Sequence, residues 1–185
     1  MIVFSAPSGA GKTTLLDHIR RTVPGLVYSI SATTRPPRPN EVDGRHYFFL
    51  SEQEFHRKIE GDEFAEWQAV HGHLYGTPRY FVDRTIESGK HLVMDIDVYG
   101  KKMFDRHYPQ ASGILILPPS MDELTRRLRN RGTESEESIG VRLANAKKEI
   151  AFAQTEGKYE YTLVNDDLER AKAEVESVVH EIIDS

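Results

Sequence analysis

The residues with the clearest chemical meaning lie near the start of the chain. A short apolar stretch, a loop of small residues ending in Gly11-Lys12-Thr13, and an amphipathic segment follow one another there. This strand–loop–helix order is the context that a phosphate-binding P-loop requires, with Lys12 reaching the β- and γ-phosphates and the Thr13 hydroxyl ligating Mg²⁺. The pattern therefore predicts a site for a nucleoside triphosphate. Its expected residues are Ala6, Pro7, Ser8, Gly9, Ala10, Gly11, Lys12, Thr13 and Thr14.

Ala6 departs from the strict P-loop pattern, because it stands where the first glycine is expected. An alanine is tolerated at this position only if its φ stays below zero, since a Cβ penalises the left-handed region. The alternative interpretation of the whole run is a glycine-rich turn with an ordinary surface lysine. The flanking strand and helix patterns favour the phosphate site.

A second candidate lies in the segment 29–38, which holds two arginines, Arg35 and Arg38, among hydroxyl side chains and prolines. The prolines keep this segment non-helical. The planar guanidinium suits bidentate phosphate binding, so two of them beside a P-loop suggest a second phosphate-bearing ligand. A solvated basic loop is the alternative, and taken alone the segment favours it.

Asp95 ends an apolar run that begins at His91, as a Walker-B-like acid does. It is predicted either to bind Mg²⁺ through a coordinated water or to order the P-loop. A buried acid that caps the following helix is an equally good interpretation. Asp97 is itself a candidate N-cap for that helix.

The elements that would carry these residues alternate along the chain. Strand-like runs occur at 2–5, 91–95, 113–117 and 161–164, and helical patterns at 12–22, 98–107, 121–131, 138–154 and 168–183. Such alternation predicts an α/β fold: a three-layer P-loop core with a central parallel sheet flanked by helices. The ligand is expected at the carboxyl ends of the strands.

Two segments break this rhythm. The region of about 32–80 is rich in Pro, Gly and aromatic residues, has one helical pattern near 52–59, and is interpreted as a small α+β insertion in a core of 1–31 and 81–185. The stretch 132–137 has no apolar anchor, and with the residues up to about 142 it is expected to form a short lid. The chain is expected to be a single domain with these two appendages.

Composition limits the class of protein. The chain has 185 residues, a formal charge of −5 and a pI near 5.9, which argues against a general nucleic-acid or membrane-surface partner. It has no cysteine, which excludes disulfides and thiolate chemistry. No run of eighteen apolar residues and no signal-peptide pattern are present. We therefore expect a cytoplasmic protein with small-molecule substrates.

Further motifs converge on one family. The segments 44–49 (GRHYFF), 64–67 (FAEW), 75–77 (YGT), 95–100 (DIDVYG), 131–138 (RGTESEES) and 165–167 (NDD) follow the P-loop in order. Together the chain resembles guanylate kinases over essentially its full length. The resemblance implies Mg²⁺-dependent transfer of the γ-phosphoryl group of ATP to GMP, giving ADP and GDP. An acceptor role for dGMP is expected as well.

The resemblance also implies site residues. The GMP phosphate would be held by Ser31, Arg35, Arg38, Tyr47 and Tyr75 and the guanine by Glu66, Thr77 and Asp97, with Gly76 in the same site. A carboxylate can accept from both guanine donors, N1–H and the N2 amino group, whereas adenine offers neither. Taken alone, Glu66 reads as an exposed acid beside a core tryptophan.

The same resemblance assigns Arg127, Arg131 and Arg142 to a lid that closes on ATP, and places Asn165 near the adenine. Arg127 and Arg131 are four residues apart and share a helix face. Solvated helix arginines and, for Asn165, a strand-to-helix turn are the alternatives. Mg²⁺ is the expected cofactor, with Thr13 and Asp95 as its predicted ligands.

Two rival functions remain open. A P-loop kinase for a phosphorylated ribose would keep the loop and the lid but lack the guanine-reading residues, and Glu66 with Thr77 argues against it. A non-catalytic binding module of the same fold, which binds phosphopeptides, would have lost P-loop function, whereas Lys12 and Thr13 are present.

Overall fold

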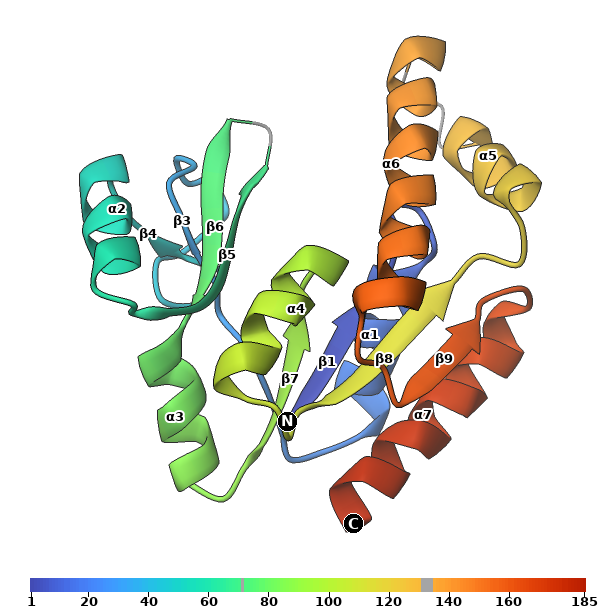
Figure 1. Cartoon of the computed structure of the whole chain (residues 1–185). Helices are drawn as coiled ribbons and strands as arrows, with labels where there is room; N and C mark the ends of the chain where they lie inside the picture. Colours follow the sequence, from blue (N-terminus) through green and yellow to red (C-terminus); the bar gives the residue numbers. More distant parts are fainter. Residues whose placement is uncertain (71, 131–134) are drawn as a thin grey trace.

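A five-stranded parallel sheet forms the centre of the molecule in this computed structural model (Figure 1). The structure describes residues 1–70, 72–130 and 135–185. The strand order is β2-β7-β1-β8-β9, and every neighbouring pair is parallel. The strands are β1 (Ile2–Ser5), β2 (Leu26–Tyr28), β7 (His91–Asp95), β8 (Ser112–Leu117) and β9 (Tyr161–Val164). The α/β class predicted from the alternation is confirmed.

Helices cover both faces of this sheet, which is why its central strand is buried throughout. All four residues of β1 are buried, as expected for a strand with packed helices on either side. Ile2 and Phe4 pack with α1 (Lys12–Thr22) and α7 (Leu168–Asp184) on one face. Val3 packs on the other face with α3 (Arg79–Glu87) and α4 (Val98–His107).

A small α+β lobe is inserted between β2 and α3. Its mixed sheet has the order β4-β3-β6-β5. The strands are β3 (Ala32–Thr33), β4 (Phe48–Phe49), β5 (Phe64–Val70) and β6 (His73–Pro78), and α2 (Glu52–Glu60) covers them. The lobe has its own core, in which the rings of Phe55 and Phe64 stack with centroids 4.3 Å apart. Ser51 and Glu54 form a capping box that starts α2.

The structure differs from the predicted elements by one or two residues at several ends, and in the three respects that follow. The strand β2 was missed because three apolar residues at a sheet edge are too short a pattern. The helix α3 was also missed; it begins at Arg79, so the expected end of the insertion at residue 80 falls within its first turn. The acidic stretch was expected to run to residue 137, but Ser135 caps the start of α6 (Glu136–Glu156).

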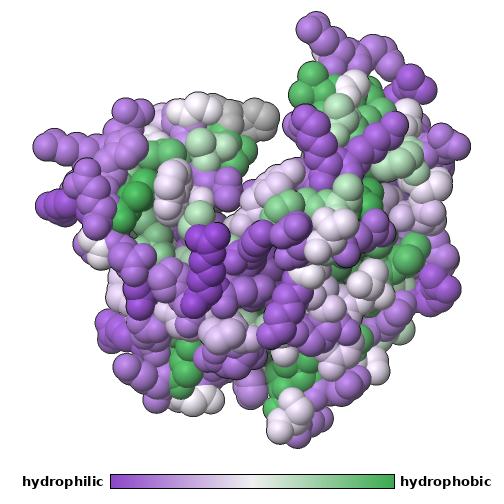
Figure 2. All heavy atoms as spheres, in the orientation of Figure 1, coloured by the Kyte–Doolittle hydropathy of each residue, from purple (hydrophilic) through white to green (hydrophobic). Residues whose placement is uncertain are grey.

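The lobe, α4 and α6 surround a hollow at the carboxyl ends of the central strands. Figure 1 shows the β5–β6 hairpin on one side and α6 with α5 (Met121–Asn130) on the other, and Figure 2 shows the surface notched between them. The fold thus places the small lobe and the start of α6 beside the P-loop. No helix within the described ranges is long and apolar enough to cross a membrane.

Candidate functional site

The P-loop adopts the geometry that its sequence predicts. It joins β1 to α1, and Gly9 and Gly11 have φ values of 92° and 97°. Asp62 is the only residue other than glycine with positive φ in the described ranges, so Ala6 keeps φ below zero. The condition for an alanine at that position is therefore met.

Asn165 supports this loop from the end of β9. Its side chain is buried, and Nδ2 donates a hydrogen bond of 2.8 Å to the carbonyl oxygen of Ala10. A Cβ at Gly11 would collide with the same amide group, so Gly11 is required by close approach as well as by its φ. The predicted contact of Asn165 with adenine stays a prediction.

Lys12 and Asp95 form an ion pair at the end of β7. The helix-capping alternative for Asp95 is wrong, because Asp97 caps α4 by accepting from the backbone N–H of Gly100 at 2.6 Å. The side chain of Asp95 is 47% exposed and its carboxylate stays accessible to a ligand. Asp97 thus caps α4, whereas Asp95 faces Lys12 of the P-loop.

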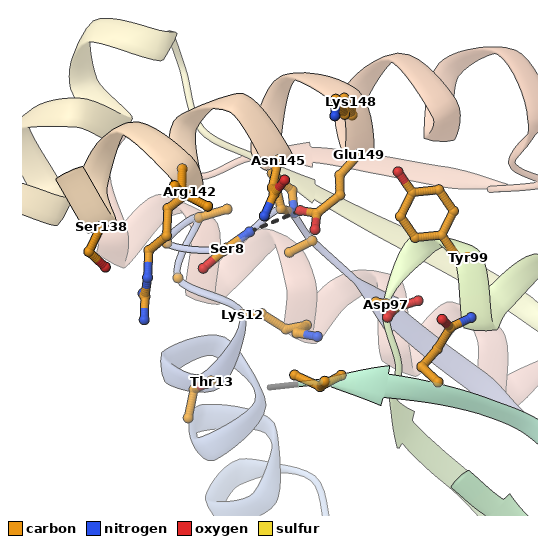
Figure 3. Close-up of a pocket in the computed structure, with 18 of the residues that line it drawn as sticks. Ser8, Lys12, Thr13, Asp97, Tyr99, Ser138, Arg142, Asn145, Lys148 and Glu149 are labelled. Carbon is orange, nitrogen blue, oxygen red and sulfur yellow. Dashed lines mark hydrogen bonds between the residues drawn. The ribbon is translucent and has the colours of Figure 1, made fainter. Parts of the chain in front are cut away.

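The P-loop forms one wall of a cavity of about 1130 Å³. Asp95 and Asp97 line it, and Arg142, Asn145 and Glu149 of α6 line it from above Lys12 and Thr13 in the view of Figure 3. The structure therefore brings the predicted lid residue Arg142 to the P-loop. The predicted residue Arg131 lies outside the described residues.

Arg127 is placed differently from this expectation, since it is absent from the cavity lining. Its guanidinium donates to Glu123 and to the carbonyl oxygen of Asn165, each at 2.8 Å. In this conformation Arg127 links α5 to the end of β9. Its contact with ATP stays a prediction.

A second cavity of about 250 Å³ lies between α1, β2 and the small lobe. Three of the predicted GMP residues line it, namely Ser31, Tyr47 and Thr77. Thr13 and Asp95 line both cavities. The two hollows therefore meet at the P-loop threonine and the β7 aspartate.

Arg35 lies with the predicted tyrosines in a cluster on the small lobe. Its guanidinium is 5.4 Å from the ring centre of Tyr47, and the rings of Tyr47 and Tyr75 lie 6.0 Å apart edge to face. Glu41 accepts from Arg35 at 2.8 Å and from the backbone N–H of Arg38 at 2.7 Å. The hydrogen bond from Arg35 lowers the pKa of Glu41 to about 2.

The side chain of Arg38 is exposed and, like those of Arg35 and Tyr75, lines neither cavity. Its backbone N–H donates to Glu41, the acid that also binds Arg35, so Arg38 borders the same cluster. Glu41 is a residue that our sequence reasoning missed. The available signal was an acid three residues after Arg38 in a loop otherwise rich in basic groups. Its carboxylate holds Arg35 where an acceptor phosphate is expected.

Glu66 is buried, with 5% of its surface exposed. The interpretation of this residue as an exposed acid is therefore wrong. The Thr77 hydroxyl donates to its Oε1 at 2.6 Å, and burial raises the pKa of Glu66 to about 7. A Cβ on Gly100 would lie 2.8 Å from Oε2, so the first turn of α4 closes against this carboxylate.

Gly76 lies on β6, beside the strand β5 that carries Glu66. A Cβ there would be 2.9 Å from the carbonyl oxygen of Glu66, too close for a side chain. The glycine thus lets β6 pack against β5. This structural role explains the residue type, and its predicted contact with a ligand stays a prediction.

Comparisons with known proteins agree with this geometry. The family model described as guanylate kinase matches residues 1–182. Similar proteins named guanylate kinase include one from Caldanaerobacter subterraneus, 46% identical over 97% of this chain and 85% of its own length. Another, from Thermotoga maritima, is 45% identical over 97% of this chain and 85% of its own length.

A solved structure of guanylate kinase from Anaplasma phagocytophilum has the same fold. It superposes with a TM-score of 0.70 at 30% identity, covering 98% of this chain and 84% of that one. The family match spans the P-loop, the small lobe and α6 alike. The chain belongs to the guanylate kinase family.

Proposed function

We propose that this nucleoside monophosphate kinase transfers the γ-phosphoryl group of ATP to GMP where its two cavities meet. The observation that carries this proposal is the shared lining of both cavities by Thr13 and Asp95. Phosphoryl transfer requires the donor and acceptor oxygens to lie roughly in line around one phosphorus atom. A triphosphate on the P-loop and a monophosphate held by the small lobe would meet there.

The chain acts by positioning and by neutralising charge. A GMP phosphate dianion is already a nucleophile, so no general base is needed, and none is assigned. Lys12 and Arg142 line the larger cavity and would stabilise the charge on the transferred group. Arg127 and Arg131 are proposed to join them when the lid closes, which requires Arg127 to leave Glu123.

The residues present fit a Mg²⁺ ion. The Thr13 hydroxyl and the Asp95 carboxylate are oxygen donors of the type that Mg²⁺ prefers, and two protein groups suffice because phosphates and waters complete its shell. They would hold the ion at the junction of the cavities. When bound, the ion would neutralise charge on the β- and γ-phosphates.

The guanine is proposed to lie against Glu66, Thr77 and Asp97. Ionised Glu66 can accept from guanine N1–H and the N2 amino group at once, and Thr77 already orients its carboxylate. Ser31, Arg35, Arg38, Tyr47 and Tyr75 would bind the phosphate. Arg35 would exchange Glu41 for the phosphate or bind both.

We further propose that the small lobe (about 32–80) and the segment of about 132–142 close over the substrates. Closure would exclude water, which otherwise competes with GMP as the acceptor. The hollow between the lobe and α6 leaves room for this movement (Figure 2).

The proposal is tested by turnover with ATP against a panel of nucleoside monophosphates, detecting ADP in a coupled assay. GMP is expected to be the preferred acceptor, and dGMP is included because the sequence leaves it open. Activity with a phosphorylated ribose instead, or phosphopeptide binding without turnover, would support one of the rival functions.

Arg38→Met is expected to raise the KM for GMP and to change the KM for ATP much less. A lost charge-assisted hydrogen bond costs about 1.5–3 kcal/mol, and Arg38 lies on the acceptor lobe. Arg45→Met, another exposed arginine of that lobe, serves as the control. Equal effects on both nucleotides would place Arg38 at the transferred phosphoryl group.

GMP binding is expected to weaken as the pH falls below about 7, the pKa to which burial raises Glu66. Below that pH the free protein carries a proton on Glu66, which must be released before both guanine donors can be accepted. Calorimetry between pH 5.5 and 8.5 measures this pH dependence of GMP affinity in the wild type and in the Glu66→Gln variant. The phosphate of GMP titrates with a pKa near 6 in both experiments, at about the value for phosphoserine. Only the difference between the pH profiles of the wild type and the variant therefore reports on Glu66. Identical pH profiles would contradict the role.

A further inference from the structure

Glu149 makes a contact with the P-loop that the functions above leave unused. Its Oε2 accepts a hydrogen bond from the backbone N–H of Ser8 at 3.3 Å, across 141 positions of sequence (Figure 3). Both residues line the larger cavity. The contact ties the middle of α6 directly to the loop that is proposed to hold the triphosphate.

The spacing along α6 connects this contact to the lid arginine. Arg142 and Glu149 are seven residues apart, which is close to two helical turns, so they share one face. Asn145 lies between them, and all three line the cavity. The rotation of α6 about its axis therefore decides at once where Glu149 and Arg142 point.

The apolar packing of α6 divides into two parts on either side of Glu149. Ile139 and Ala146 pack with α5, whereas Ala153 packs with Val98 and Leu115 of the core. The ring of Phe152 also lies 4.6 Å from that of Tyr99. Glu149 thus lies where α6 passes from the core to the part that carries Arg142.

Two of the three buried positions of α6 are alanines. Small side chains interlock less than large ones, so these two positions constrain the rotation of this helix weakly. A polar contact to a rigid loop supplies a constraint that these alanines do not. The hydrogen bond from Ser8 to Glu149 is such a contact, made directly between the P-loop and α6.

We propose that Glu149 is a positioning residue, which holds α6 against Ser8 so that Arg142 lies over the phosphates on the P-loop. This inference rests on the proposed function, since it assigns Arg142 to the transferred phosphoryl group. Glu149 itself does not touch the reacting atoms. It affects turnover by positioning Arg142, which lies two helical turns earlier on α6.

The test is a double-mutant cycle on kcat between position 149 and Arg142→Met. Glu149→Ala is expected to lower kcat about 10- to 100-fold, the range for a displaced catalytic group, with the KM for GMP little changed. Glu149→Gln keeps an acceptor oxygen and is expected to recover most of kcat. In the Arg142→Met background, Glu149→Ala is expected to lower kcat by less than a further twofold, because the guanidinium that Glu149 positions is already gone.

Glu149→Asp is the second variant, for use if the alanine variant does not fold. It keeps the charge but withdraws the carboxylate by one methylene, and is expected to behave like alanine. Glu156→Ala is the matched control, since Glu156 lies on the same helix and pairs with Lys102 at 2.7 Å, away from the P-loop. The backbone amide signal of Ser8, followed by NMR, reports independently whether its acceptor is lost.

A kcat within twofold of wild type for Glu149→Ala, or a full further loss in the Arg142→Met background, would overturn the proposal. Tighter ATP binding by Glu149→Ala at unchanged kcat would overturn it too, since the carboxylate would then be a competitor of the phosphates. The cycle is run with whichever monophosphate gives the highest turnover. If the preferred acceptor were a nucleotide other than GMP, the proposed function would be wrong, but the test of Glu149 would still be valid.

Discussion

Lys12→Ala is expected to lower turnover by about 10²–10³-fold while GMP binding stays nearly intact. The magnitude is that of removing one preorganised group that stabilises charge in the transition state. Lys12 opens α1 and lines the larger cavity, whereas three of the predicted GMP residues, Ser31, Tyr47 and Thr77, line the smaller one. Steady-state kinetics give the loss in kcat, and calorimetry with GMP gives the affinity.

The variant is expected to fold, because Asp95, which Lys12 pairs with, is 47% exposed and can be solvated alone. Lys172→Ala is the matched control, since Lys172 forms an exposed pair with Glu169 at 2.6 Å on α7. Loss of GMP binding together with activity, in a variant that unfolds at the wild-type temperature, would contradict the division into two sites.

Glu66→Gln is expected to narrow the preference for GMP over AMP. A site built to hydrogen-bond its substrate rejects an analogue without those groups by about 10⁴–10⁵-fold, because its own polar groups stay unpaired. With AMP the Glu66 carboxylate would face the N1 lone pair. The glutamine presents one donor, which suits adenine N1, and can no longer accept from both guanine donors.

The expected loss in kcat/KM for GMP is about 1–3 kcal/mol, the cost of one unsatisfied buried polar group. Thr77 can still donate to the remaining amide oxygen, so the local fold is kept. Glu63→Gln, an exposed acid of the same lobe paired with Lys58, is the control. A GMP-to-AMP ratio equal to that of wild type would mean that Thr77 and Asp97 read the base without Glu66.

Local patterns predicted most of the core. The P-loop, its strand and its helix follow from one run of residues, because glycine φ values and a helix start depend on neighbours in sequence. The strands at 2–5, 91–95 and 161–164 were predicted with the bounds that the structure has. Short or edge elements such as β2 were missed, since three apolar residues carry little periodic signal.

Residue types by themselves predicted a phosphate site at Gly11-Lys12-Thr13, with arginines and a carboxylate available for it. Only the tertiary structure decided which groups meet. The carboxylate of Glu66 gains its raised pKa from burial under Gly100. Likewise, Glu149 reaches Ser8 from 141 positions away. The physical reason is that such contacts depend on how whole helices and strands pack, which no spacing within one segment encodes.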